Sequence, residues 1–157
     1  MPMIMVGPGT GVAPFVGFLE HIENSTDLSV ACERYLFFGC RNEDLDYIYR
    51  SKLEAFLTRK VLSHLVVSFS QQDGRSETRS RYVQDSVRKH AEGLAKLLLS
   101  NARTKIYVCG DIQRMSKDVC EAFTDILVSA GGKTREEAEI YLNDLKASKR
   151  YVQDLWI

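Results

Sequence analysis

Five short runs of apolar residues constrain the fold of this chain more than any other feature. They lie at 3–6, 35–38, 65–69, 106–109 and 151–156. Short unbroken apolar runs are typical of strands that are buried on both faces of a parallel sheet. Such strands need a layer of helices on each side, so the runs predict an α/β architecture of three layers.

The segments between these runs carry the spacing of amphipathic helices. Apolar residues at i, i+3, i+4 and i+7 from Phe15 onward predict a helix that ends near Ile22. Similar patterns predict helices over 47–57, 83–98, 115–127 and 134–145. Thr134 and Glu137 have the spacing of a capping box at the start of the last one. Because strands and helices alternate, we expect about five mostly parallel strands with helices on both faces.

Length and composition exclude several classes of protein. A chain of 157 residues suits one domain, which we place at 1–157. It has 21 Lys and Arg against 21 Asp and Glu, and this balance disfavours binding to nucleic acid by bulk charge. No apolar run approaches the roughly 20 residues of a membrane span. Because a strand pattern begins so close to residue 1, we expect this domain to be a fragment of a longer protein.

The cysteines indicate reduced thiols rather than a metal site or a disulfide framework. They are Cys32, Cys40, Cys109 and Cys120. No two of them form a C-x-x-C pair, and no histidine cluster accompanies them, so we expect no metal. Unpaired cysteines are typical of a cytoplasmic protein.

A glycine-rich turn follows the first apolar run. Residues 7–14 read GPGTGVAP and join a strand to a helix. Glycines let backbone N–H groups approach a phosphate, and a helix N-terminus adds the positive end of its dipole. Val12 stands where the dinucleotide fingerprint has its last glycine, and the lysine of a P-loop is missing. The turn therefore predicts a phosphate site, and an ordinary tight turn is the alternative.

Polar side chains also follow the third apolar run. They are Ser70, Arg75, Arg79, Arg81, Tyr82 and Gln84. Hydroxyl, guanidinium and aromatic groups together suit a phosphate and a stacked adenine. The alternative is a solvated, charged loop.

The last two apolar runs end in groups that could take part in chemistry. Cys109 and Asp111 flank Gly110 at the end of one run, while Asp154 and Trp156 lie in the other. In a parallel sheet, ligands bind beyond the carboxyl ends of the strands, where these groups are expected. Two alternatives remain: Cys109 is a buried small side chain, and Trp156 is a cap on the core.

Five motifs taken together resemble the NADP(H)-binding domain of the ferredoxin–NADP reductase superfamily, in its diflavin reductase branch. They are MVGPGTGVAPF, YLFFGCRNEDLDYIY, VSFS followed by RYVQD, IYVCGDIQRMSKDV and RYVQDLW. The resemblance covers essentially the whole chain in order and implies a Rossmann-like fold. Within the branch, LFFGCR, HLVVSFS and KRYVQDLW are most similar to methionine synthase reductases.

The resemblance implies a role for each candidate site residue. The pyrophosphate of NADP would be held by Gly9, Thr10 and Gly11. The 2′-phosphate and the adenosine would be surrounded by Ser70, Arg81, Tyr82 and Gln84. The nicotinamide side would be lined by Cys40, Arg41, Cys109, Asp111 and Met115. Asp154 would complete a hydride-transfer group with Cys109, and Trp156 would stack on a flavin ring.

This sequence departs from the family pattern in two places. Gln71 stands directly after Ser70, where the family commonly has arginine, and this weakens the site for a 2′-phosphate unless Arg81 or another arginine substitutes. Ile157 stands where serine is common. The family's FAD- and FMN-binding modules would precede residue 1.

The resemblance implies a flavin-dependent oxidoreductase. This domain would bind NADPH, hydride would pass to FAD, and electrons would continue through FMN to an acceptor protein, expected to be methionine synthase. Two other interpretations stay open: the same domain of a cytochrome P450 reductase-like enzyme, and a nucleotide-binding module without catalysis. Without its flavin modules, we expect the chain to bind nucleotide but not to turn over.

Overall fold

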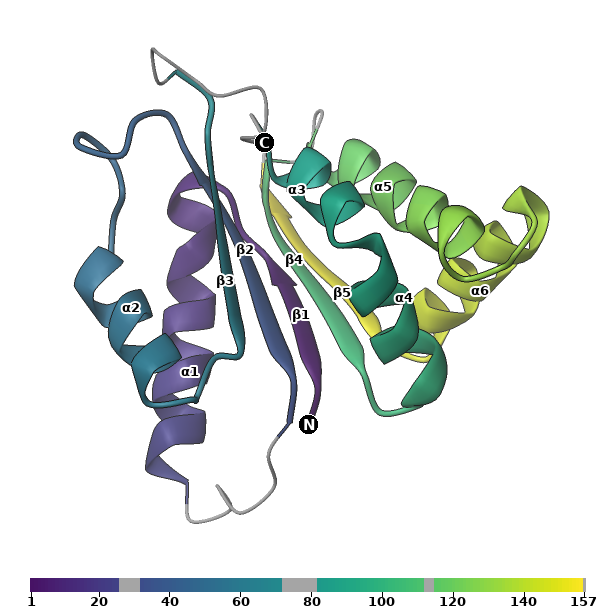
Figure 1. Cartoon of the computed structure of the whole chain (residues 1–157), viewed down its shortest axis with the longest axis horizontal. Coiled ribbons are helices and arrows are strands. Elements are labelled where there is room, and N and C mark those ends of the chain that lie inside the picture. Colours follow the sequence, from purple (N-terminus) through teal and green to yellow (C-terminus); the bar gives the residue numbers. More distant parts are fainter. Residues whose placement is uncertain (26–31, 72–81, 112–114, 157) are drawn as a thin grey trace.

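The computed structural model describes residues 1–25, 32–71, 82–111 and 115–156. Its centre is one sheet of five strands in the order β3-β2-β1-β4-β5 (Figure 1). The strands are β1 (Met3–Val6), β2 (Arg34–Cys40), β3 (His64–Phe69), β4 (Lys105–Asp111) and β5 (Tyr151–Trp156). Every neighbouring pair is parallel, so the predicted α/β class and the predicted number of strands are confirmed.

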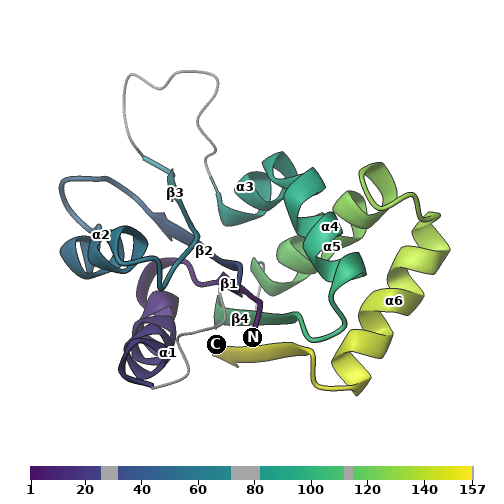
Figure 2. The same ribbon diagram turned by 60° about the horizontal axis from the view of Figure 1, so that its bottom comes forward.

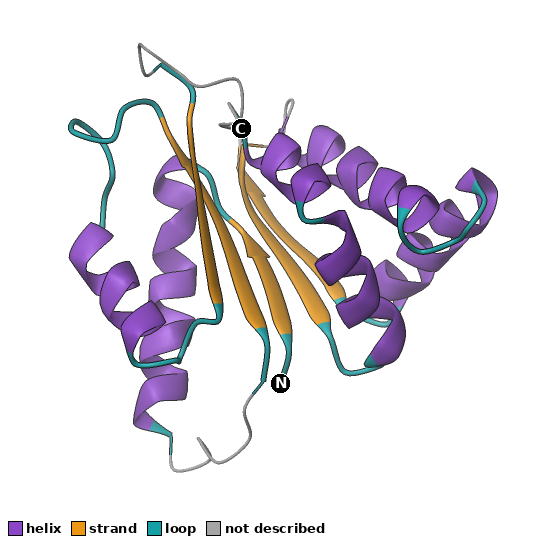
Figure 3. Cartoon of the chain, in the orientation of Figure 1, coloured by secondary structure: helices purple, strands orange, loops and turns teal. Residues whose placement is uncertain are grey.

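Helices cover both faces of the sheet and make the three layers (Figures 2 and 3). One face carries α1 (Ala13–Asn24) and α2 (Arg50–Thr58). The other carries α3 (Val83–Lys89), α4 (Ala91–Ser100), α5 (Met115–Ser129) and α6 (Arg135–Ala147). None of the helices in the described ranges has both the length and the hydropathy that a membrane crossing requires.

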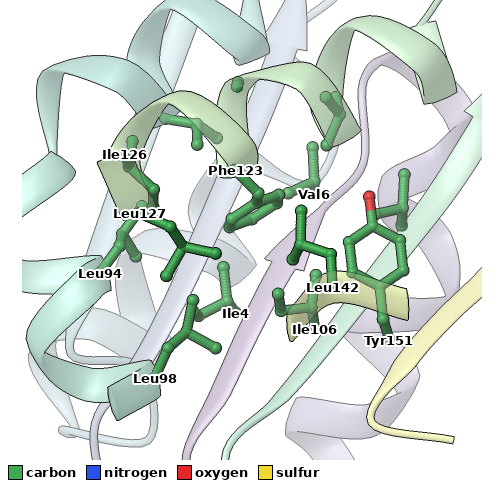
Figure 4. Close-up of a cluster of buried hydrophobic side chains, with 14 of the residues drawn as sticks. Ile4, Val6, Leu94, Leu98, Ile106, Phe123, Ile126, Leu127, Leu142 and Tyr151 are labelled. Atoms are coloured by element: carbon green, nitrogen blue, oxygen red, sulfur yellow. The ribbon is translucent and has the colours of Figure 1, made fainter. Parts of the chain in front are cut away.

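Alternation along β1 divides the core in two. Met3 and Met5 point into the cluster beneath α1 and α2, while Ile4 and Val6 point into the cluster beneath α3 to α6 (Figure 4). All four are buried, as the unbroken apolar run predicts. Full burial of a side chain of this size stabilises the fold by about 1.5–3 kcal/mol, so β1 anchors both layers.

Two predicted helices differ from those observed. The helix predicted at 47–57 begins only at Arg50, because Tyr49 has a left-handed backbone (φ 59°) that cannot continue a helix. The helix predicted at 83–98 is two helices, α3 and α4, separated at His90. The predicted capping box is confirmed: Glu137 N–H donates to the Thr134 hydroxyl (3.1 Å), and Thr134 N–H donates to the Glu137 carboxylate (3.1 Å).

Candidate functional site

A cavity of about 740 Å³ lies at the carboxyl ends of β1, β2 and β3. This size is within the range of pockets that hold small-molecule ligands and cofactors. Its walls come from the turn after β1, the ends of β2 and β3, and the first turns of α3 and α5. They are formed by Pro8, Gly9, Thr10, Gly39, Cys40, Arg41, Asp46, Ile48, Ser68, Ser70, Tyr82, Val83, Gln84, Met115 and Asp118.

Backbone packing fixes the turn after β1. Gly9 has φ +58°, a conformation that glycine adopts without strain. A Cβ on Gly11 would lie 2.2 Å from the carbonyl oxygen of Cys109, so only glycine lets this turn pack directly on β4. Gly9 and Thr10 line the cavity, whereas Gly11 is buried behind them. Of the three residues predicted at the pyrophosphate, two face the cavity and one supports the turn.

The wall beyond β2 is organised by Asp46. Its carboxylate accepts hydrogen bonds from the backbone N–H of Asn42 (2.7 Å), the backbone N–H of Arg41 (3.0 Å) and Arg41 Nε (3.2 Å). These bonds hold the pKa of the Asp46 carboxyl below its usual range, so it stays ionised. Asp46 therefore holds Arg41 through both its backbone and its side chain, which the sequence alone did not indicate.

Cys40 lies in the same wall as a protonated thiol. It is buried, and burial together with the negative charges of Asp46 and Glu43 raises its pKa to about 11. A thiol with this pKa is a poor nucleophile at neutral pH. Cys40 therefore shapes the cavity and does not attack a ligand.

The end of β3 contributes a buried hydroxyl that lacks a partner. Ser68 lines the cavity, and its Oγ is buried without a hydrogen-bond partner in the part of the chain that the structure describes. Buried polar atoms are nearly always paired, so an unpaired hydroxyl in a cavity wall is a candidate to bind a ligand or a water molecule. Sequence reasoning missed Ser68, although it precedes Ser70 by two residues and strand alternation puts both on one face.

The first turns of α3 and α5 close the cavity. Tyr82 caps α3 and leaves 46% of its surface exposed, and Gln84 follows on the same helix. Met115 and Asp118 face them from α5. Tyr82 and Gln84, predicted at the adenosine, and Met115, predicted near the nicotinamide, all line this cavity. Asp118 and Ile48 also line it and were not predicted.

A second group lies beside the cavity, on β4 and β5. Cys109 is the register partner of Asp154, and Asp111 is the register partner of Trp156. Cys109 is buried, and burial together with the charge of Asp154 raises its pKa, so the thiol is protonated beside a carboxylate. Trp156 keeps 43% of its surface exposed, which favours a surface role over the core cap considered as an alternative. None of these four residues lines the cavity.

Several predicted positions lie outside the described residues. They are Arg75, Arg79, Arg81 and Ile157. Within the described ranges, no three His, Cys, Asp or Glu side chains gather in a way that could hold a metal ion.

Comparison with known proteins shows which family this chain belongs to. The model of the oxidoreductase NAD-binding domain matches residues 5–121. Human methionine synthase reductase is 44% identical over 99% of this chain and 23% of its own length. The NADPH–cytochrome P450 reductase of Dictyostelium discoideum is 42% identical (99% and 22%), and the sulfite reductase [NADPH] flavoprotein alpha-component of Photobacterium profundum is 39% identical (99% and 24%). The chain spans about a quarter of the length of these relatives.

Proposed function

Because this chain belongs to the family of oxidoreductase NAD-binding domains, we propose that it is the NADP(H)-binding domain of a diflavin reductase. In the longer protein, hydride would pass from NADPH to FAD, and electrons would continue through FMN to an acceptor. Methionine synthase reductases are 40% to 46% identical to this chain, against 38% to 42% for P450 reductases. The higher identities, 44% to 46%, belong to the mammalian methionine synthase reductases, which supports methionine synthase as the acceptor. The four free thiols support a cytoplasmic setting.

The cavity with its unpaired Ser68 hydroxyl is the observation that carries the proposal. Its residues fit an adenine dinucleotide with a 2′-phosphate. Gly9 and Thr10 would approach the pyrophosphate from the turn after β1, which leads into a helix N-terminus. Ser68 and Ser70 would donate hydroxyl hydrogens to phosphate oxygens, and Tyr82 would stack on the adenine.

The Cys109–Asp154 pair supports a domain that takes part in a reaction rather than one that only binds. NADPH, when bound, supplies the hydride. Cys109 would keep a proton at Sγ, because burial and Asp154 both favour the neutral thiol. Asp154 would place a carboxylate on the edge strand β5, where it favours positive charge developing on a neighbouring ring. Trp156, exposed beside them, would cover the flavin.

Calorimetric titration of NADP⁺ into the chain tests the nucleotide site. Wild type should bind, and Tyr82→Ala should weaken binding about tenfold, because stacking of a base on an aromatic ring is worth about 1–3 kcal/mol. Leu99→Ala is the control: Leu99 is exposed to a similar degree (43%) on α4, away from the cavity. Absence of binding, or equal binding by Tyr82→Ala and wild type, would overturn the proposal.

A further inference from the structure

Among the described residues that directly follow β3, Ser70 and Gln71, neither is a cation that could pair with a 2′-phosphate. We propose that Arg41, from the end of β2, supplies this cation, and that Asp46 is a positioning residue that aims Arg41 into the cavity. This inference rests on the proposed binding of NADP(H) and names what would distinguish NADP(H) from NAD(H) in this chain.

Backbone hydrogen bonds place Arg41 beside Ser70 and Gln71. The ladder between β2 and β3 ends at the pair Cys40 and Phe69. It is continued by Ser70 N–H, which donates to the Cys40 carbonyl (3.0 Å), and by Gln71 N–H, which donates to the Arg41 carbonyl (2.8 Å). Arg41 is thus a direct neighbour of the two residues at which the 2′-phosphate is expected. The resemblance had placed it on the nicotinamide side instead.

Asp46 holds Arg41 in a way that leaves its phosphate-binding edge available. The carboxylate contacts the guanidinium through Nε (3.2 Å). In the described part of the chain, the two terminal nitrogens have no hydrogen bond, and the side chain is 71% exposed. These two nitrogens form the fork that binds a phosphate with two parallel hydrogen bonds. An arginine already oriented by a carboxylate loses less side-chain entropy when the phosphate arrives.

Replacing Asp46 with asparagine tests the proposal, because two explanations of its role predict opposite changes in phosphate affinity. If only net charge mattered, Asp46→Asn would tighten phosphate binding, because it removes a negative charge from the cavity wall. If Asp46 positions Arg41, the same change weakens it, because the neutral amide cannot hold Arg41 Nε and two backbone N–H groups as strongly. The two explanations thus predict opposite changes in affinity.

The experiment compares two probes that differ only in the 2′-phosphate: adenosine 2′,5′-bisphosphate and adenosine 5′-monophosphate. Each is titrated calorimetrically into wild type, Arg41→Gln, Arg41→Lys, Asp46→Asn and the control Arg59→Gln, which pairs with Glu23 outside the cavity. Arg41→Gln should lower the preference for the bisphosphate about 10- to 100-fold. Asp46→Asn should lower it roughly threefold to tenfold. Arg41→Lys should fall between wild type and Arg41→Gln, and Arg59→Gln should match wild type.

Unchanged affinity for the monophosphate shows that a variant is folded and that its adenosine site is intact. Arg81→Gln is titrated in the same way. If Arg41→Gln keeps the wild-type preference for the bisphosphate over the monophosphate, or if Arg81→Gln loses that preference instead, the assignment of Arg41 is overturned. Tighter binding of the bisphosphate to Asp46→Asn would overturn the positioning role. Failure of the wild type to bind either probe or NADP⁺ would instead contradict the proposed function itself.

Discussion

Replacing Gly11 with alanine should damage both the fold and the nucleotide site. The new Cβ would lie 2.2 Å from the carbonyl oxygen and 3.0 Å from the carbonyl carbon of Cys109. Both contacts are with backbone, so no side chain can rotate away. The turn after β1 must move from β4 by about 1 Å, and overpacking of this kind costs about 1–3 kcal/mol. The same movement shifts Gly9 and Thr10, so NADP⁺ should also bind more weakly.

Urea unfolding followed by circular dichroism measures the first effect, and calorimetry with NADP⁺ measures the second. Gly17→Ala is the matched control, because a Cβ on Gly17 meets nothing within 4 Å and the residue lies inside α1. It should raise the free energy of unfolding by about 0.5–1 kcal/mol, the usual gain when alanine replaces glycine in a helix. Wild-type stability in Gly11→Ala would refute the claim that close packing on Cys109 requires glycine.

Three further predictions concern single side chains. Trp156→Ala should lower the free energy of unfolding by less than about 1 kcal/mol, since the ring is 43% exposed, whereas loss of a buried ring costs about 3–5 kcal/mol; a large loss in urea unfolding would restore the core-cap interpretation. Thr134→Ala removes the capping box of α6 and should cost about 1 kcal/mol in the same assay, and an unchanged midpoint would contradict it. Folding raises the pKa of Cys40 to about 11. The protonated thiol therefore contributes fully to the free energy of unfolding below about pH 9, near the ordinary pKa of a thiol, and this contribution is lost as the pH rises towards 11. Cys40→Ala should therefore lose less stability than wild type between pH 8 and 10.5, and equal losses would show that the thiol does not contribute.

The sheet could be predicted from the sequence because its three central strands, β1, β2 and β4, are largely buried and contain short apolar runs, while the edge strands β3 and β5 are more exposed. The starts of α3 and α5 and the capping box of α6 were also predicted, but the start of α2 was not. Tyr49 takes a left-handed conformation that no spacing of apolar residues reveals, so the helix predicted at 47–57 begins late. The division at His90 was missed because the apolar spacing continues across it, from Val87 in α3 to Leu94 in α4.

The candidate site was predicted in part, for a similar reason. Motifs at strand ends indicated Gly9, Thr10 and Ser70, because a parallel sheet brings its carboxyl ends together. The bond between Asp46 and Arg41 depends on how a loop folds back on itself. The position of Arg41 beside Gln71 depends on the register between β2 and β3. Neither follows from local periodicity, so both required the structure.

Anaerobic addition of NADPH to the full-length product of the gene that encodes this chain tests the central claim most directly. The protein should carry FAD and FMN, and its visible flavin absorbance should fall as hydride arrives. Cys109→Ala should slow this fall and leave the affinity for NADP⁺ nearly unchanged, because the thiol would act on hydride transfer and not on binding. A full-length product that lacks flavin, or one whose bound flavin stays oxidised after NADPH is added, would contradict the account.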